Sequence, residues 1–222
     1  MSRRIITTAR VAVLGLAAAT SLTALAAAPA HAAGNTVASK SGNILFVTAA
    51  AGTGNDITVL RTSNGQFYDV RDLAGTSAGA GCQSTGPRSA LCSAIGISEI
   101  RISAGDLGDR VTLNTSTFSR VTGGTGDDVL RSINPISQAR LSGNDGNDQL
   151  FGTLSDSLFG QNGNDLMVGG RLLVGGEGSD TMKGQDGNDS LDGGNGFDNL
   201  DGGTGFDDLC ANAEVTVNCE AF

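Results

Sequence analysis

Residues 175–210 read GGEGSDTMK GQDGNDSLD GGNGFDNLD GGTGFDDLC, which is four nine-residue units in an unbroken row. Three more copies of the unit precede them, at residues 123–131, 143–151 and 160–168. All seven follow the pattern G-x-x-G-x-D-x-U-x, where U is Leu or Met. A repeat this short cannot bury a core alone, so its period predicts a solenoid of stacked repeats.

The residue types within the unit account for its spacing. Glycine permits positive φ or close backbone approach in a turn. Four of the seven units begin with two glycines, so the second glycine is the looser requirement. The x-U-x segment predicts a very short strand with one inward side chain, and two units make one coil of a parallel β-solenoid. The predicted inward residues are Leu130, Leu150, Met167, Met182, Leu191, Leu200 and Leu209.

The sixth position of every unit is Asp. A short carboxylate beside turn carbonyls offers oxygen ligands only, which favours a hard cation such as Ca²⁺. The sequence contains no D-x-[DN]-x-[DN]-G loop, which argues against an EF-hand. The candidate metal ligands are Asp128, Asp148, Asp165, Asp180, Asp189, Asp198 and Asp207.

The unit resembles the calcium-binding nonapeptide of the repeats-in-toxin (RTX, hemolysin-type) family, over residues 123–210. This resemblance implies a right-handed parallel β-roll in which calcium lies between neighbouring turns on the same side. It also implies that the sixth-position Asp and the turn carbonyls are the ligands. Toxin activity does not follow from it, because a repeat of this kind occurs in proteins of unrelated function.

Three stretches keep the strand pattern but lose the turn: residues 132–142, 152–159 and 169–174. If each still forms half a coil, successive turns alternate between the two sides of the roll. One side then receives Asp128, Asp148, Asp165, Asp180 and Asp198, and the other receives the three altered turns followed by Asp189 and Asp207. This arrangement predicts about five ions, four on the first side and one on the second. The alternative is that residues 132–142 form a bulged loop.

The N-terminus has the features of a cleaved export signal. Arg3, Arg4 and Arg10 precede an apolar stretch at residues 11–28, and a small-residue site predicts cleavage after Ala32. A membrane anchor is the alternative. Removal of residues 1–32 takes away the only histidine and leaves a net charge of −12. Histidine-dependent catalysis and histidine zinc sites are then excluded, and an extracellular location is expected.

Composition changes sharply near residue 122. Residues 33–122 carry six acidic and seven basic residues, whereas residues 123–209 carry fifteen and four, with 21 of the 34 glycines. We expect a β-rich capping region at 33–122, the β-roll at 123–210 and a C-terminal cap at 211–222. Asn64-Gly65 predicts a hairpin between residues 57–61 and 67–70. Residues 52–56 and 105–109 resemble weakened calcium turns.

Four cysteines in an exported chain indicate disulfides. Three connectivities are possible, and sequence proximity favours Cys82–Cys92 with Cys210–Cys219. A structural metal site is the alternative, although neither pair has C-x-x-C spacing.

The pattern as a whole predicts a secreted, non-catalytic calcium-binding protein, serving as an extracellular or cell-surface scaffold or adhesive module. Its expected partners are calcium and components of the cell surface or matrix. The acidic repeats would repel nucleic acid, and no membrane span is expected in the mature chain. The alternative function is a calcium-dependent polysaccharide lyase, for which the candidate residues are Arg101, Arg110, Arg120, Asp106 and Asp109. Apolar residues at outward strand positions are either packed or part of an association patch: Phe151, Leu166, Val168, Phe159, Leu172 and Val174.

Overall fold

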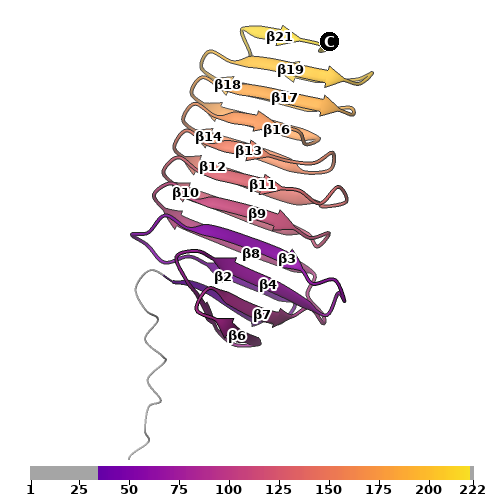
Figure 1. Cartoon of the computed structure of the whole chain (residues 1–222). Coiled ribbons are helices and arrows are strands. Elements are labelled where there is room, and N and C mark those ends of the chain that lie inside the picture. Colours follow the sequence, from indigo (N-terminus) through magenta and orange to yellow (C-terminus); the bar gives the residue numbers. More distant parts are fainter. Residues whose placement is uncertain (1–34, 221–222) are drawn as a thin grey trace, which may run out of the picture. The chain divides into compact units, whose positions relative to one another are not determined.

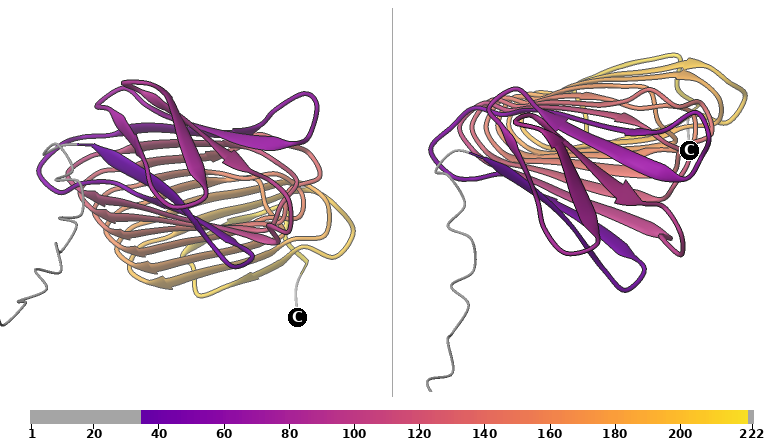
Figure 2. Two further views of the ribbon diagram at one scale, coloured as in Figure 1. Left: turned by 90° about the horizontal axis from the view of Figure 1, so that it is seen from below. Right: turned by 60° about the horizontal axis from the view of Figure 1, so that its bottom comes forward.

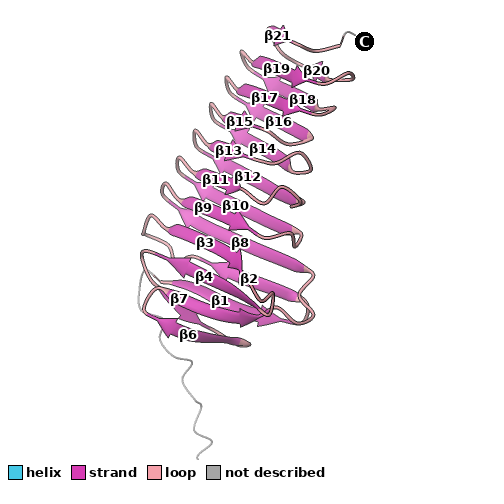
Figure 3. Ribbon diagram, turned by 45° about the vertical axis from the view of Figure 1, so that its right-hand side comes forward, coloured by secondary structure: helices cyan, strands magenta, loops and turns pink. Residues whose placement is uncertain are grey.

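The computed structural model describes residues 35–220, in which every regular element is a β-strand (Figures 1 and 3). The strands form two sheets, here called sheet A and sheet B. Sheet A consists, in spatial order, of β20 (Leu209–Ala211), β18 (Ser190–Asn195), β16 (Leu172–Glu177), β14 (Ser157–Asn162), β12 (Ala139–Asp145), β10 (Ser119–Thr125), β8 (Glu99–Asp106), β2 (Ile44–Thr48), β1 (Thr36–Ser41) and β5 (Thr76–Ala78). Sheet B consists of β21 (Val215–Val217), β19 (Asn199–Thr204), β17 (Thr181–Asp186), β15 (Leu166–Val168), β13 (Gln149–Phe151), β11 (Val129–Ser132), β9 (Arg110–Asn114), β3 (Asp56–Arg61), β4 (Phe67–Asp72), β7 (Ser89–Ser93) and β6 (Cys82–Gly86).

From β8 onward the chain alternates between the sheets, so each coil contributes one strand to each. Neighbouring coils pair in parallel, and equivalent residues lie directly above one another, as Leu130, Leu150 and Met167 do. The predicted β-solenoid is therefore confirmed. Residues 132–142 form half a coil, because β12 pairs in register with both β10 and β14.

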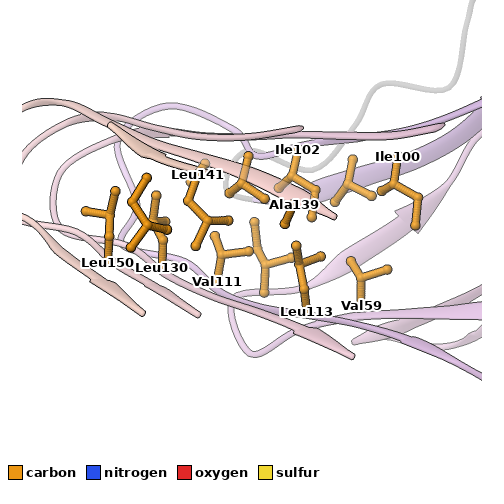
Figure 4. Close-up of a cluster of buried hydrophobic side chains, with 14 of the residues drawn as sticks. Val59, Ile100, Ile102, Val111, Leu113, Leu130, Ala139, Leu141 and Leu150 are labelled. Carbon is orange, nitrogen blue, oxygen red and sulfur yellow. The ribbon is translucent and has the colours of Figure 1, made fainter. Parts of the chain in front are cut away.

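The core is a narrow strip between the two sheets (Figure 4). In the early coils each strand points more than one apolar side chain inward, as Ile100 and Ile102 do from β8. In the repeat coils the x-U-x segment supplies a single one, and six of the seven predicted inward residues are at most 1% exposed. The prediction for Leu209 is wrong, because it is 39% exposed and Cys210 pairs with Leu191 instead. With so little apolar burial per coil, the repeats need a further source of stability.

The N-terminal region continues the same solenoid below residue 122 (Figure 2). The change in composition near residue 122 falls inside β10 and does not mark the end of the solenoid. The strand pairs β8–β9 and β2–β3 stack beneath β10 and β11 as two additional coils. Antiparallel strands β1, β4, β7 and β6 then close this end. The hairpin around Asn64-Gly65 is confirmed, with Gly65 at φ 68°. The predicted Cys82–Cys92 disulfide joins β6 to β7.

At the other end, β20 and β21 complete the last coil, and the predicted Cys210–Cys219 disulfide links β20 to the segment that follows β21. Of the 211–222 cap, residues 211–220 are described. The predicted signal segment, residues 1–32, lies outside the described residues. Within residues 35–220, we find no helix of the length and apolar character needed to cross a membrane.

Candidate metal centre

The turns that lead from sheet A to sheet B form one continuous column along the solenoid. Each of these turns places its last residue, just before the sheet B strand, in a buried position. The residues of this first column are Asn55, Asp109, Asp128, Asp148, Asp165, Asp180 and Asp198, each at most 3% exposed. The five aspartates expected on one side of the roll are therefore on one side. Asn55 and Asp109, from the two weakened turns, extend the column downward.

A hydrogen-bond ladder ties the column together. In each step the backbone N–H of one column residue donates to the side-chain Oδ1 of the residue one coil further on. The donor–acceptor distances are 2.7 Å for Asn55–Asp109, 2.8 Å for Asp109–Asp128, 2.8 Å for Asp128–Asp148, 2.7 Å for Asp148–Asp165, 2.8 Å for Asp165–Asp180 and 2.8 Å for Asp180–Asp198. Each carboxylate is thus held in one orientation by the coil below it.

The second carboxylate oxygen, Oδ2, is buried in the described structure without a hydrogen-bond partner. This holds for Asp109, Asp128, Asp148, Asp165, Asp180, Asp189 and Asp198. A buried carboxylate oxygen with no partner is costly, and native structures rarely leave one so unless an ion or water satisfies it. A row of such oxygens indicates a row of cations.

The first glycine of each unit borders the same space as this oxygen. At Gly160, a Cβ atom would lie 2.0 Å from Asp165 Oδ2 and 2.8 Å from the carbonyl oxygen of Gly175, one coil further on. The corresponding pair at Gly123 is Asp128 Oδ2 and the Gly143 carbonyl, at 2.0 Å and 2.8 Å. Glycine is required here because a side chain would fill the space that a carboxylate and a carbonyl share.

The second position is looser because residues with a side chain can occupy it at a lower positive φ than the glycines of the other units adopt. In three units this position is Asn144, Gln161 or Gln185, which adopt φ of 82°, 86° and 79°. Asparagine tolerates this left-handed region better than most residues do.

Burial dominates the electrostatics of the column. Burial, with a smaller contribution from neighbouring carboxylates, raises the pKa of Asp128 and Asp165 from the ordinary 3.8 to about 7. Burial likewise raises the pKa of Asp148, Asp180 and Asp189 to about 6. The charged carboxylates are therefore unfavourable without a counter-charge, which a divalent cation would supply.

A second, shorter column lies on the opposite side, where turns lead from sheet B to sheet A. Asp189 is buried there as predicted, but its ladder partner is Asp208, whose Oδ1 accepts from the Asp189 N–H at 2.9 Å. Asp207 is exposed and accepts from Asn188 Nδ2 at 3.3 Å. The choice of Asp207 is thus corrected to Asp208. The last turn contains one extra residue, which allows Cys210 to reach its inward position and its disulfide.

In the C-terminal cap a glutamate carboxylate ends each column by accepting a hydrogen bond from its last aspartate, which the sequence analysis did not predict. Glu214 Oε2 accepts from the Asp198 N–H at 2.7 Å, and Glu220 Oε2 accepts from the Asp208 N–H. The carbonyls of Asn212 and Asn218 stand where the next repeat would place its first glycine. The detectable signal is the repeated Asn-x-Glu at residues 212–214 and 218–220.

The altered turns of the second side bury one aspartate, Asp156, in a different manner. Its two carboxylate oxygens accept from the Ala139 N–H at 2.6 Å, the Thr153 N–H at 2.8 Å and the Ser137 hydroxyl. Protein donors therefore satisfy Asp156 completely. It is a structural carboxylate, unlike those of the columns.

The donor set fits calcium. No group of three or more Asp, Glu, His or Cys side chains that could hold a metal occurs within residues 35–220. Each site would instead combine the free Oδ2 of a coil with backbone carbonyls, which are hard oxygen ligands of the kind that Ca²⁺ accepts. Among the residues considered for a polysaccharide lyase, Asp109 belongs to the first column. Arg101 and Arg120 lie elsewhere, on the outer face of sheet A, where both pair with Glu99.

Comparison with known proteins agrees with this chemistry. The model of the RTX calcium-binding nonapeptide repeat matches residues 140–154, 155–171 and 174–209. No curated protein and no solved structure matches the chain. The matched segments cover the coils whose turns supply Asp148, Asp165, Asp180, Asp189 and Asp198. Residues 140–209 are therefore RTX calcium-binding nonapeptide repeats arranged on a β-solenoid.

Proposed function

We propose that this chain is a secreted protein whose repeat turns fold around calcium, and that it serves as an extracellular or cell-surface scaffold or adhesive module. The observation that carries the proposal is the column of buried carboxylates, each with one oxygen held by the ladder and the other free beside a carbonyl. The calcium-binding repeats support the metal. The N-terminal segment at residues 1–32 supports export.

Calcium in this proposal is part of the fold. The repeat coils bury one apolar side chain per strand, and residues 123–209 carry a net charge of −11. Millimolar extracellular calcium would neutralise the columns and stabilise the coils. A protein built this way would be ordered outside the cell, where calcium is abundant, and the outer faces of sheets A and B would be available to partners.

We propose five ions: four between the first-column turns from Asp128 to Asp198, and one between Asp189 and Asp208. We propose a non-catalytic role, because the acidic groups buried in the turns of residues 35–220 contact one another and the backbone.

The test is a far-UV circular dichroism titration of residues 33–222 with calcium, with magnesium as control, followed by calorimetry for the stoichiometry. We expect a cooperative gain of β-signal between about 0.01 and 1 mM calcium, none with magnesium, and about five ions bound. A β-spectrum that a chelator leaves unchanged, together with no heat of calcium binding, would overturn the proposal. Export is tested separately by the N-terminal residue of the protein recovered from the medium, which should be Ala33.

A further inference from the structure

The outer face of sheet A carries a row of arginines on a protein that is otherwise strongly acidic. Arg101 of β8 lies beside Arg120 of β10, which lies beside Arg140 of β12, each pair in register on adjacent parallel strands. Adjacent strands are about 4.8 Å apart, so the row presents guanidinium groups at that interval. All three arginines are exposed.

A hollow of about 560 Å³ lies at the end of this row. Arg120, Arg140 and Arg171 line it, and no acidic residue does. Glu99 pairs with Arg101 at 2.8 Å and with Arg120 at 3.0 Å, which leaves Arg140 and Arg171 without an ion pair within the described residues. The nearby Asp156 is buried and satisfied by protein donors. The hollow therefore has a local positive charge.

The remaining lining combines hydroxyl and amide groups with apolar side chains. Gln138, Ser155 and Ser157 offer neutral hydrogen-bonding groups, while Phe118, Phe159 and Leu172 offer apolar surfaces. The guanidinium of Arg140 lies over the Phe159 ring, 3.9 Å from its centroid, and that of Arg120 lies 5.1 Å from the Phe118 centroid. Stacking on a ring restricts the arginine and leaves the edge of its planar fork available to a carboxylate.

The position of the hollow explains why three turns depart from the calcium pattern. Its lining includes Gln138, Ser155 and Arg171, which lie in or directly after the altered turns at the second side. A glycine-aspartate turn at these places would bring carboxylates and cations to the edge of the hollow. The altered turns bring an arginine, a glutamine and a serine instead.

We propose that this hollow and the arginine row beside it bind the carboxylate groups of a linear acidic polysaccharide. The forked guanidinium matches a carboxylate in two parallel hydrogen bonds, the hydroxyl-rich lining matches sugar hydroxyls, and the apolar side chains match the flat faces of sugar rings. A polymer with one carboxylate per sugar can contact several arginines of the row at once. This gives the proposed adhesive function a partner chemistry, but it does not depend on which groups hold calcium.

The charge of the chain argues against a nucleic acid as the occupant. A phosphate backbone would approach the first column of aspartates along one edge of sheet A, and only a few arginines would offset that repulsion. The few cations are concentrated at one hollow, which suits a short segment of a carboxylated chain.

The experiment uses residues 33–222 folded in calcium and the trimer of galacturonate, titrated by calorimetry. The methyl-esterified trimer, which has the same sugars without charge, is the ligand control. We expect Arg140→Gln combined with Arg171→Gln to weaken binding of the trimer at least tenfold. Arg131→Gln is the matched protein control, because Arg131 lies over the Phe151 ring at 4.1 Å on the opposite sheet; it should change the affinity less than twofold.

Arg140→Lys separates fork recognition from charge alone, and we expect it to recover only part of the lost affinity. Binding should also weaken as salt rises from about 50 to 200 mM. Circular dichroism checks that each exposed-residue variant remains folded. No binding of the trimer, equal binding of its ester, equal loss in the Arg131 variant, or tighter binding of a single-stranded DNA oligomer would each overturn the proposal. Failure of calcium-dependent folding would be seen separately, in the circular dichroism titration.

Discussion

Replacement of Asp165 by Asn tests whether the column is built for cations. Asp165 is 3% exposed, its Oδ1 accepts from the Asp148 N–H at 2.7 Å, and its Oδ2 has no partner. Asn keeps the Oδ1 acceptor and places an N–H₂ donor where the free oxygen faces the Gly175 carbonyl. The ladder therefore survives the substitution, whereas the buried charge and the metal ligand do not.

The magnitudes follow from two opposing effects. A pKa raised from 3.8 to about 7 corresponds to a destabilisation on the order of 4 kcal/mol at pH 8 in chelator, which Asn removes. Calcium offsets this cost in the wild type: a site with Kd of about 0.1 mM contributes about 1.4 kcal/mol at about 1 mM free calcium, and about 1.4 kcal/mol more for each further tenfold. Asp165→Asn is thus more stable than the wild type in chelator, and its advantage shrinks as calcium rises.

The assay is urea unfolding at a series of free calcium concentrations at which the wild type is folded, and in chelator the far-UV circular dichroism β-signals of the two proteins are compared instead. Asp156→Asn is the matched control, because Asp156 is equally buried but is satisfied by the Ala139 and Thr153 N–H groups. Its free energy of unfolding should lie about 1–3 kcal/mol below that of the wild type and run parallel to it at all calcium concentrations. If the Asp165→Asn curve also ran parallel to the wild type, or lay below it in chelator, the assignment of Asp165 as a ligand would be refuted.

Three further predictions follow from the geometry. Without calcium, the raised pKa values of the column aspartates mean that the free energy of unfolding is greatest below about pH 4 and falls as pH rises through 6 to 7, while calcium affinity rises over the same window. Circular dichroism in chelator measures the first effect, and calorimetry at pH 5.5 and 8 measures the second. An apo form that is most stable at pH 8 would contradict the assignment. Gly160→Ala should remove one bound calcium and about 2 kcal/mol of stability, because its Cβ would lie 2.0 Å from Asp165 Oδ2. Gly86→Ala is the control, because its Cβ would have no atom within 4 Å, and it should be neutral. Calorimetry and thermal unfolding measure both variants. Glu214→Ala should cost about 1–3 kcal/mol by leaving the Asp198 N–H without its acceptor, and Glu214→Gln should restore most of it; equal effects of the two would show that the cap does not act through this hydrogen bond.

The nonapeptide pattern predicted the repeat coils well because each residue in it has a local task. Gly160 must have no side chain, Asp165 must be short, and Met167 must be apolar, and all three lie within one unit and its neighbour. Since each repeat contacts only adjacent coils, the pattern places Asp148, Asp165 and Asp180 on one side once the altered stretches between them are counted as half-coils. The calcium chemistry followed from the same residues.

The last repeat shows where the pattern stops being sufficient. Asp207 and Asp208 are adjacent, and the nonapeptide register selects Asp207. The structure selects Asp208, because Cys210 must reach Leu191 in the core and its partner Cys219 in the cap. The choice of carboxylate thus goes together with the register of β20, in which Cys210 takes the position above Leu191.

Two more features depend on stacking across coils. The solenoid extends down to β2 and β3 although the turn between them departs from the repeat and carries Asn55 in place of Asp, since alternating residues such as Ile57 and Val59 fill the same core strip. The sequence by itself determined the period, the turn chemistry and the inward residue of six of the seven repeats, because these are properties of one unit and its neighbour. The tertiary structure alone decided how far the column runs, how the cap ends it, and that Arg120, Arg140 and Arg171 border one hollow, because residues 20 to 50 positions apart become neighbours only when the coils stack.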